Sequence, residues 1–415
     1  MVDGDPQDRG RRLLVLGAGP AQLGLLAAAR RRELYVIAAD RDPSAPGFRH
    51  ADRRAIVSVE DEQGIERLAA AERVRGIVAP GIDWPVAIAA RVASRLALAH
   101  AISPETAGLC TSKLQQRERF AEAGVPQPEF VACRGIDEAR RAAEQLGYPC
   151  VVKAPDRQGQ RGLSLVESPD RLEIAVERAL DASRTASLLV ERQVAGTEVT
   201  VNAFSVAGTF FPLTITDRHL AAPPAFGVAL AHSWPSTLEP RTIAIAIDAA
   251  RKAAAAVEVR DGPTYTQVLV PESRTPLVGE LAARVGGGHD AELCRVAVGV
   301  DLNALTIDAA FGERIARQRV APTARADGAC IRFLVAPEGE LRTVSGLEEA
   351  HGREGILGIR IYRRPGHVFG PLRRGSDRAG AILATGESAG DALERADEAA
   401  RLIRFDVARV GTEVA

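Results

Sequence analysis

The segment at residues 267–288, QVLVPESRTPLVGELAARVGGG, constrains the fold more than any other part of the chain. Two apolar runs flank turn-forming residues, which predicts a β-hairpin with a glycine-rich exit. Gln267 and Glu280 lie on opposite arms, so the hairpin would bring an amide oxygen and a carboxylate together. These oxygen ligands suit a hard cation such as Mg2+, with Mn2+ as an alternative. Arg284 follows, and its guanidinium can hold an anionic oxygen, which together indicates phosphoryl transfer.

The length and composition narrow the class of protein. A chain of 415 residues exceeds what one hydrophobic core supports, which predicts two or three domains. The formal net charge of -1 argues against a general binder of nucleic acid or anionic membranes. No apolar run has the length of a membrane helix, and the N-terminus lacks a signal-peptide core. Five scattered cysteines without CxxC spacing favour a reducing cytoplasm and argue against a zinc site.

Lysine is rare in this chain. Among 53 basic residues only Lys113, Lys153 and Lys252 are lysines. Where arginine is so strongly preferred, a lysine indicates a need for a compact point charge. Lys252 lies in an alanine-rich helical run and is interpreted as a surface residue. Lys113 lies in a helix predicted at residues 111–123, led by threonine and serine as cap candidates. Lys153 ends an apolar strand at residues 150–153, where the plain interpretation is an outward-facing side chain.

The N-terminal stretch begins with an apolar strand, and GAGPAQLG follows it. A strand, a glycine turn and a helix in this order are typical of dinucleotide-binding folds. Gly17 and Gly19 fit that pattern, but Gln22 replaces the third glycine. Asp40 ends the next strand, about where a ribose-binding acid would lie. The pattern indicates a Rossmann-like unit and leaves binding of a nicotinamide dinucleotide as an alternative.

Apolar strands at residues 55–59 and 76–79 alternate with helical stretches at 62–73 and 86–98. This alternation predicts a parallel sheet covered by helices, closing near residue 110.

The middle of the chain carries a flexible loop and two candidate carboxylates. The segment PDRQGQRGLSLV follows Lys153. It can close over phosphates and bind them through backbone N–H groups and arginine guanidinium groups. Glu191 and Glu198 flank a glycine turn between two strands, where the alternative is a pair of solvated carboxylates. His219 and His232 lie in a predicted loop, and both are expected to be exposed.

Taken in order, these motifs resemble the ATP-grasp ligase superfamily over roughly residues 13–405. The resemblance implies a mixed α/β and α+β ATP-grasp fold with a Rossmann-like N-terminal domain and a C-terminal α+β lobe. The implied divisions are a Rossmann-like pre-ATP-grasp domain at 1–110, a small subdomain with lysines and lid at 111–188, a central subdomain with hinge and metal hairpin at 189–320, and the C-terminal lobe at 321–415.

The resemblance also implies residue roles. Lys113 and Lys153 would hold ATP phosphates, and Lys153 would act in catalysis together with Arg284, which faces the acyl phosphate or substrate. Glu191 and Val194 would form the adenine hinge. The remaining roles are Glu198 as the ribose-binding acid, Gln267 and Glu280 as the metal ligands, and Gln158, Gly159, Gln160, Arg161 and Gly162 as the lid over the phosphates.

Two positions depart from the family pattern. Gln267 stands where a glutamate is usual, although a glutamine also occurs there in carbamoyl-phosphate synthetases. The usual asparagine two residues after the second ligand is Ala282, which leaves a second metal in doubt. The run GELAARVGGGHD looks most like the amino-acid and dipeptide ligase branch.

The implied activity is an ATP-dependent carboxylate–amine ligase that forms an amide through an acylphosphate and releases ADP and phosphate. Its partners would be a small carboxylate and an amine, such as amino acids, with Mg-ATP and without nucleic acid or membrane, and related enzymes are often homodimers. The alternatives are a non-catalytic ATP-binding protein of the same fold and an NAD-dependent oxidoreductase.

Overall fold

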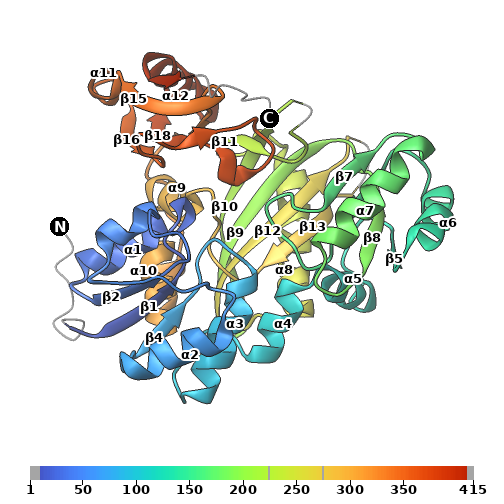
Figure 1. Cartoon of the computed structure of the whole chain (residues 1–415), viewed down its shortest axis with the longest axis horizontal. Helices are drawn as coiled ribbons and strands as arrows, with labels where there is room; N and C mark the ends of the chain where they lie inside the picture. The colour runs from blue at the N-terminus through green and yellow to red at the C-terminus, as the bar shows by residue number, and fades with distance from the viewer. Residues whose placement is uncertain (1–9, 223–224, 273–274, 409–415) are drawn as a thin grey trace, which may run out of the picture.

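The computed structural model describes residues 10–222, 225–272 and 275–408, whose strands form four sheets (Figure 1). The first sheet is parallel and near the N-terminus, and the other three are antiparallel. The predicted combination of α/β and α+β architecture is confirmed. Within those three ranges, the helices fall short of the length and apolarity needed to cross a bilayer.

The N-terminal unit is a helix-covered parallel sheet with strand order β3-β2-β1-β4, as predicted. The strand predicted at residues 55–59 is wrong in its limits, because β3 pairs with β2 only up to Ala55 and the chain then turns toward the next helix. Helix α10 returns from later in the chain to pack on α1 and β4 (Figure 1). The elements are β1 (Arg12–Leu16), α1 (Leu23–Arg31), β2 (Tyr35–Ala39), β3 (Arg53–Ala55), α2 (Glu62–Ala71), β4 (Gly76–Val78), α3 (Trp84–Arg95) and α4 (Pro104–Thr111).

Protein groups fill the glycine turn of this unit. Gln22 is 1% exposed, and its Nε2 donates to the Pro80 carbonyl at 2.6 Å. The Asp40 carboxylate accepts from the backbone N–H of Ala18 at 2.8 Å, so an anion already occupies the turn that a dinucleotide phosphate would need. These contacts give the motif a structural explanation and lend no support to the nicotinamide alternative.

The second sheet has the order β5-β8-β6-β7, with α6 and α7 packed against it. The helix predicted at residues 111–123 is present as α5, and Ser112 is its N-cap because its side chain accepts from the Gln115 N–H. The elements are α5 (Lys113–Glu122), β5 (Phe130–Cys133), α6 (Ile136–Leu146), β6 (Cys150–Lys153), β7 (Leu163–Val166), α7 (Leu172–Ala182) and β8 (Leu188–Arg192).

The central sheet has eight strands in the order β13-β12-β9-β10-β11-β14-β18-β16. Its β12–β13 hairpin places Gln267 opposite Glu280, as predicted, although part of the turn lies outside the described residues. The elements up to residue 320 are β9 (Thr197–Val206), β10 (Thr209–Leu220), β11 (Ala229–Trp234), α8 (Pro240–Ala256), β12 (Gly262–Val270), β13 (Leu277–Ala282), α9 (Asp290–Val298) and α10 (Leu302–Ala310).

The C-terminal strands extend that same sheet through β14, β18 and β16, so the limit expected at 320–321 falls within one continuous sheet. The domain limits therefore stay a prediction. A small third antiparallel sheet, β17-β15-β19, lies beside α11 and α12 (Figure 1). The elements are β14 (Gly328–Leu334), β15 (Gly339–Ser345), α11 (Leu347–His351), β16 (Ile356–Ile361), β17 (Val368–Phe369), β18 (Gly380–Gly386), α12 (Ala389–Leu402) and β19 (Arg404–Ala408).

The loop expected to expose both histidines is partly sheet. Strand β10 runs on to Leu220 and pairs with β11, which begins at Ala229. His219 is exposed as expected, but His232 is 3% exposed, so its expected exposure is wrong. The reason is that β11 lies inside the central sheet, between β10 and β14.

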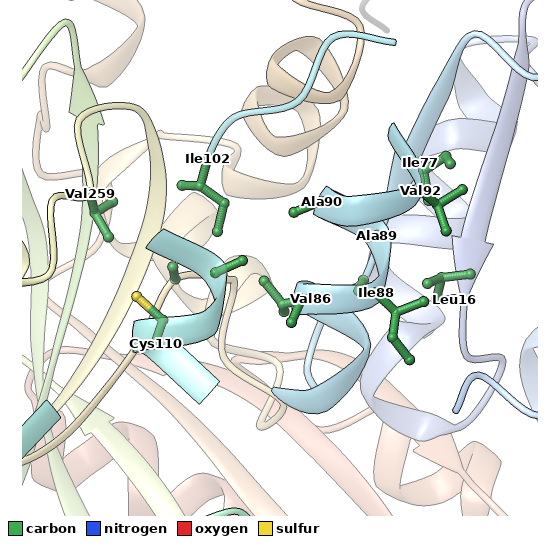
Figure 2. Packing of buried hydrophobic residues seen from close by; sticks show 14 of the residues in the cluster. Leu16, Ile77, Val86, Ile88, Ala89, Ala90, Val92, Ile102, Cys110 and Val259 are labelled. Carbon is green, nitrogen blue, oxygen red and sulfur yellow. The ribbon is translucent and has the colours of Figure 1, made fainter. Parts of the chain in front are cut away.

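A continuous hydrophobic core joins the N-terminal unit to the hairpin. Figure 2 shows Leu16 and Ile77 on one side of helix α3, whose residues Val86 and Ile88 lie between them and Val259. The same cluster includes Val278 and Leu281 of β13 and alanines of α8. Because protein interiors are closely packed and hard to compress, this cluster holds the hairpin at a fixed position relative to the first sheet.

We expect Gly196→Ala to destabilise the fold. Gly196 has a φ of 148°, and a Cβ there would lie 2.2 Å from the Val270 carbonyl oxygen. Strained backbone and overpacking together should lower the free energy of unfolding by about 3 kcal/mol. Denaturant unfolding would measure this change. Gly370→Ala is the control, because a Cβ there meets nothing within 4 Å, and an equal loss in both variants would contradict the expectation.

Candidate active site

Arg117 of α5 connects the second sheet to the hairpin. It is 2% exposed, and its Nε lies 2.8 Å from Glu191 Oε1 on β8. Its other nitrogens donate to the backbone carbonyls of Val278 and Gly279 on β13, at 3.0 and 2.7 Å. Charge-assisted bonds of this kind are strong when buried, so one side chain fixes the helix, β8 and β13 relative to each other.

Lys153 shares the same carboxylate. Its Nζ lies 2.8 Å from Glu191 Oε2, and the lysine is only 9% exposed, so the outward-facing interpretation is wrong. Burial lowers the pKa of Lys153 to about 8, with Arg117 and Lys113 adding to this effect and Glu191 opposing it. Burial alone would raise the pKa of Glu191, but Arg117 and Lys153 hold it below its usual value. Lys153 is therefore buried near two other cations, Arg117 and Lys113.

Lys113 meets the hairpin directly. Its Nζ lies 3.2 Å from Glu280 Oε2 and donates to the Arg157 carbonyl at 2.6 Å. Burial would raise the pKa of Glu280, but Lys113, Lys153 and Arg284 lower it, so the carboxylate is ionised at neutral pH. The structure thus brings together both predicted lysines, the predicted metal ligand and the predicted arginine.

Glu198 and Gln267 lie on neighbouring strands and contact each other. The Gln267 Nε2 donates to Glu198 Oε2 at 2.6 Å, and Arg218 Nε approaches the same oxygen at 3.2 Å. The phenol oxygen of Tyr265 accepts from Arg218, so these four residues form one polar cluster. A ribose hydroxyl at Glu198 would have to share the carboxylate with both donors.

Arg284 is positioned by the N-terminal unit. Its Nε and one terminal nitrogen both lie 2.6 Å from Asp83 Oδ1 at the start of α3. The two backbones approach closely there, since a Cβ on Gly287 would lie 2.9 Å from the Gly81 carbonyl. The glycine-rich exit of the hairpin is therefore needed so that Asp83 can reach Arg284.

The predicted lid, residues 158–162, contacts two other parts of the chain. The Gln160 side chain accepts from the Gly375 N–H at 3.2 Å and donates to the Gly227 carbonyl at 3.4 Å. The segment thus lies between the β10–β11 connection and the C-terminal lobe. Val194 lies in the β8–β9 connection, and no described residue hydrogen-bonds to its backbone, which leaves both groups open to a base edge.

The donor set fits a hard cation only with help from a ligand. In the described part of the chain no three His, Cys, Asp or Glu residues converge on one point. Glu280 and the Gln267 amide oxygen are oxygen donors, as Mg2+ prefers, and Mg2+ commonly takes its other ligands from phosphates and water. Ala282 is 1% exposed, and its methyl side chain offers no metal-binding oxygen, so the second metal stays in doubt.

Several residues of the site were not singled out from the sequence. Arg117 and Asp83 carry the positioning contacts, and His232 forms a buried pair with Asp290 at 3.2 Å. Burial lowers the pKa of His232 although Asp290 opposes the shift. Arginine and aspartate are common in this chain, so only their positions in the fold distinguish these from solvated residues.

Two family models match the chain. The carbamoyl-phosphate synthase L chain ATP-binding domain matches residues 112–318, and the L-amino acid ligase C-terminal domain 2 matches residues 332–408. Protein y4rH of Sinorhizobium fredii is 28% identical over 306 residues, which are 71% of this chain and 61% of that protein. Formate-dependent phosphoribosylglycinamide formyltransferase of Burkholderia thailandensis is 31% identical over 175 residues, or 42% of this chain and 43% of that enzyme.

Solved structures share the fold over nearly the whole chain. The L-amino acid ligase from Bacillus licheniformis superposes with a TM-score of 0.82 at 19% identity, covering 97% of this chain and 100% of that one. Phosphoribosylglycinamide synthetase from Anaerococcus prevotii gives a TM-score of 0.76 at 18% identity, covering 96% and 100%. The chain belongs to the ATP-grasp ligase superfamily. Its C-terminal region matches the family model of an L-amino acid ligase domain.

We expect Glu191→Gln to be strongly destabilising. The variant would leave Arg117 and Lys153 buried without a counter-charge, and breaking a buried pair in this way costs about 3–5 kcal/mol. Denaturant unfolding would measure the loss. Glu129→Gln is the control, because it removes a solvent-exposed pair with Arg192 and should change the free energy of unfolding by less than about 0.5 kcal/mol. Similar losses in the two variants would refute the role of Glu191.

Proposed function

We propose that this chain is an ATP-dependent carboxylate–amine ligase that forms an amide through an acylphosphate and releases ADP and phosphate. The observation that carries the proposal is the convergence of Lys113, Lys153, Glu280 and Arg284, which come from three separate segments: α5, β6 and the β13 arm of the hairpin with its exit. A metal-binding hairpin alone, or a single lysine, would be weaker support for this activity. The ATP-grasp fold and the two family matches agree with this chemistry.

Each residue has a role that its surroundings permit. Lys113 and Lys153 provide positive charge where the phosphates of ATP would lie, and Arg284 would contact the acyl phosphate or the substrate. Mg2+ held by Glu280 and Gln267 would neutralise charge on the transferred phosphoryl group. Because Asp83 fixes Arg284 and Glu191 fixes Lys153, little reorganisation is needed when charge develops in the transition state.

The lid provides the second requirement of the reaction, which is exclusion of water from a hydrolysable acylphosphate. Its contacts through Gln160 with Gly227 and Gly375 join it to the β10–β11 connection and to the C-terminal lobe. We assign Val194 and Glu191 to the adenine hinge. Glu191 would act there through its main chain, since its side chain is bound to Arg117 and Lys153.

The substrates are proposed to be a small carboxylate and an amine, with amino acids as the first candidates because of the L-amino acid ligase match. A cytoplasmic setting is supported by five cysteines that are all buried and unpaired in this structure. A homodimer stays a prediction. The competing proposal is a non-catalytic ATP-binding protein of the same fold, and the absence of a donor at Ala282 favours it.

Two substitutions test catalysis. We expect Glu280→Ala and Lys153→Ala each to reduce ADP release from Mg-ATP by at least a hundredfold, because each removes charge compensation for the transferred group. The assay offers pooled amino acids and small carboxylates to the purified protein. Lys252→Ala should keep full activity, since among the described residues its one ion pair is with Asp248 on the same helix, at the surface.

The assay also separates the two proposals. ADP release that requires a substrate pool identifies a ligase. ATP binding without ADP release for any pool would favour the binding protein, and release of AMP would overturn the acylphosphate mechanism.

We expect the affinity for Mg-ATP to fall above pH 8. Lys153 has a pKa of about 8 in the free protein, and phosphates beside it would raise that pKa in the complex. Below pH 8 the lysine is already charged, whereas above pH 8 binding must take up a proton. The dissociation constant should then rise up to about tenfold per pH unit. Calorimetric titration from pH 7 to 9.5 would measure this.

Lys153→Arg is the matched variant for this titration, because a guanidinium stays charged throughout that range. Its affinity should not change with pH. A pH-independent affinity in the wild type, or an unchanged slope in the variant, would contradict the assignment.

A further inference from the structure

The Gln267 side chain contacts a carboxylate on the side of its strand that faces away from Glu280. Strand β12, which carries Gln267, lies between β13 with Glu280 and β9 with Glu198. On β9, Thr200 is opposite Gln267 and Glu198 is opposite Leu269, so Glu198 is the diagonal neighbour of Gln267. Long side chains can span such a diagonal. The Gln267 Nε2 accordingly donates to Glu198 Oε2 at 2.6 Å.

This contact fixes the orientation of the Gln267 amide. An ionised carboxylate only accepts hydrogen bonds, so the amide must present its NH2 group to Glu198. Because the amide is planar, its oxygen is directed away from Glu198, and the strand on that side of β12 is β13 with Glu280. No described residue donates a hydrogen bond to Gln267 Oε1, which leaves this oxygen open to a cation.

Glu198 is itself held in place by two neighbours. Arg218 Nε lies 3.2 Å from Glu198 Oε2, and both side chains are largely buried. A second nitrogen of Arg218 donates to the Tyr265 phenol oxygen, which also accepts from Thr200 Oγ1 at 3.4 Å. Glu198 Oε2 thus receives both donors, whereas Glu198 Oε1 has no hydrogen-bond partner among the described residues. A ribose hydroxyl at Oε1 is compatible with the contact between Oε2 and Gln267.

The same contact explains why a glutamine suits position 267 in this chain. A glutamate there would bring a second carboxylate into contact with Glu198, and like charges at such a distance repel each other. The neutral amide avoids this repulsion and leaves Glu280 as the hairpin carboxylate that faces the cation. Glu198 and Gln267 therefore form a matched pair of an anion and a neutral donor.

We infer that Glu198 is a positioning residue that orients the Gln267 amide oxygen toward the cation, while Arg218 and Tyr265 hold the carboxylate in place. The inference rests on the proposed function, because it requires a cation at the hairpin. Replacing a residue that orients a metal ligand through a hydrogen bond commonly lowers metal affinity by about tenfold to a hundredfold. A contact that only stabilises the sheet would leave metal affinity unchanged.

Calorimetric titration with the β,γ-imido analogue of ATP, which is not hydrolysed, tests this inference. The dissociation constant of the analogue is measured with Mn2+ and again with EDTA, and the ratio of the EDTA value to the Mn2+ value is the manganese effect. In the wild type, Mn2+ should tighten binding by about tenfold or more. Glu198→Gln should reduce the manganese effect by about tenfold and leave the affinity in EDTA unchanged.

Two further variants separate orientation from simple ligation. A new carboxylate ligand from Gln267→Glu would ordinarily strengthen metal binding, but here the manganese effect should fall, because the new carboxylate and Glu198 repel each other. The double variant Glu198→Gln/Gln267→Glu again pairs one amide with one carboxylate, so its manganese effect should return at least to the wild-type value. Glu349→Gln is the control and should change nothing, because Glu349 lies in an exposed pair with Arg353.

Thermal unfolding without ligand shows whether each variant is folded, and Gln267→Glu tests the inference by itself if Glu198→Gln does not fold. An unchanged manganese effect in Glu198→Gln, or a larger one in Gln267→Glu, would overturn the inference. A double variant that is no better than the single variants would also contradict it. Equal losses of affinity with Mn2+ and with EDTA in Glu198→Gln would assign this carboxylate to the nucleotide instead.

These results would leave the proposed ligase activity standing. A wild type without any manganese effect would overturn both the inference and the metal-binding role of the hairpin, so failure of the inference and failure of the proposed function are distinguishable.

Discussion

The buried ion pair between Arg117 and Glu191 is the interaction on which the site depends. Arg117 leaves α5, reaches the Glu191 carboxylate on β8 and donates to two backbone carbonyls of β13. Lys153 then uses the second oxygen of that carboxylate. Arg117 therefore joins the second sheet, which also carries Lys153, to the hairpin that carries Glu280. A single guanidinium thus helps to set the spacing between Lys153 and the carboxylate proposed to bind the metal.

Two further ion pairs bring the N-terminal unit to the same place. Asp83 holds Arg284 at the exit of the hairpin. Glu60 pairs with Arg184 at 2.7 Å, and the Arg184 guanidinium lies over the Trp84 ring, which connects the N-terminal unit to the sheet that carries the lid. The hydrophobic cluster of Figure 2 packs between the N-terminal unit and the hairpin and so supports this arrangement. The N-terminal unit therefore orients Arg284 of the proposed active site, and its own glycine turn is filled by Gln22 and Asp40.

The interpretations from the sequence succeeded where a local pattern has one structural solution. Two apolar runs around a turn predict a hairpin that brings Gln267 and Glu280 together, and β12 and β13 pair these residues through a register shift next to Gln267. They failed where burial depends on neighbours far away in the chain. Lys153 looked solvated because it ends a strand, and His232 looked exposed because prolines and alanines surround it. In both cases another strand covers the residue.

The sequence by itself determined the order of elements, the hairpin pairing, the cap at Ser112 and the set of residues that resemble an ATP-grasp site. These follow from contacts within a few residues or from motif spacing, which the chain carries locally. Only the tertiary structure decided which charges are paired and which are not. Arg117 pairs with Glu191 across 74 positions and Asp83 with Arg284 across 201, whereas the buried Nε of Arg378 has no hydrogen-bond partner among the described residues. The physical reason is that burial and electrostatic pairing depend on distances in space, which one-dimensional spacing does not specify.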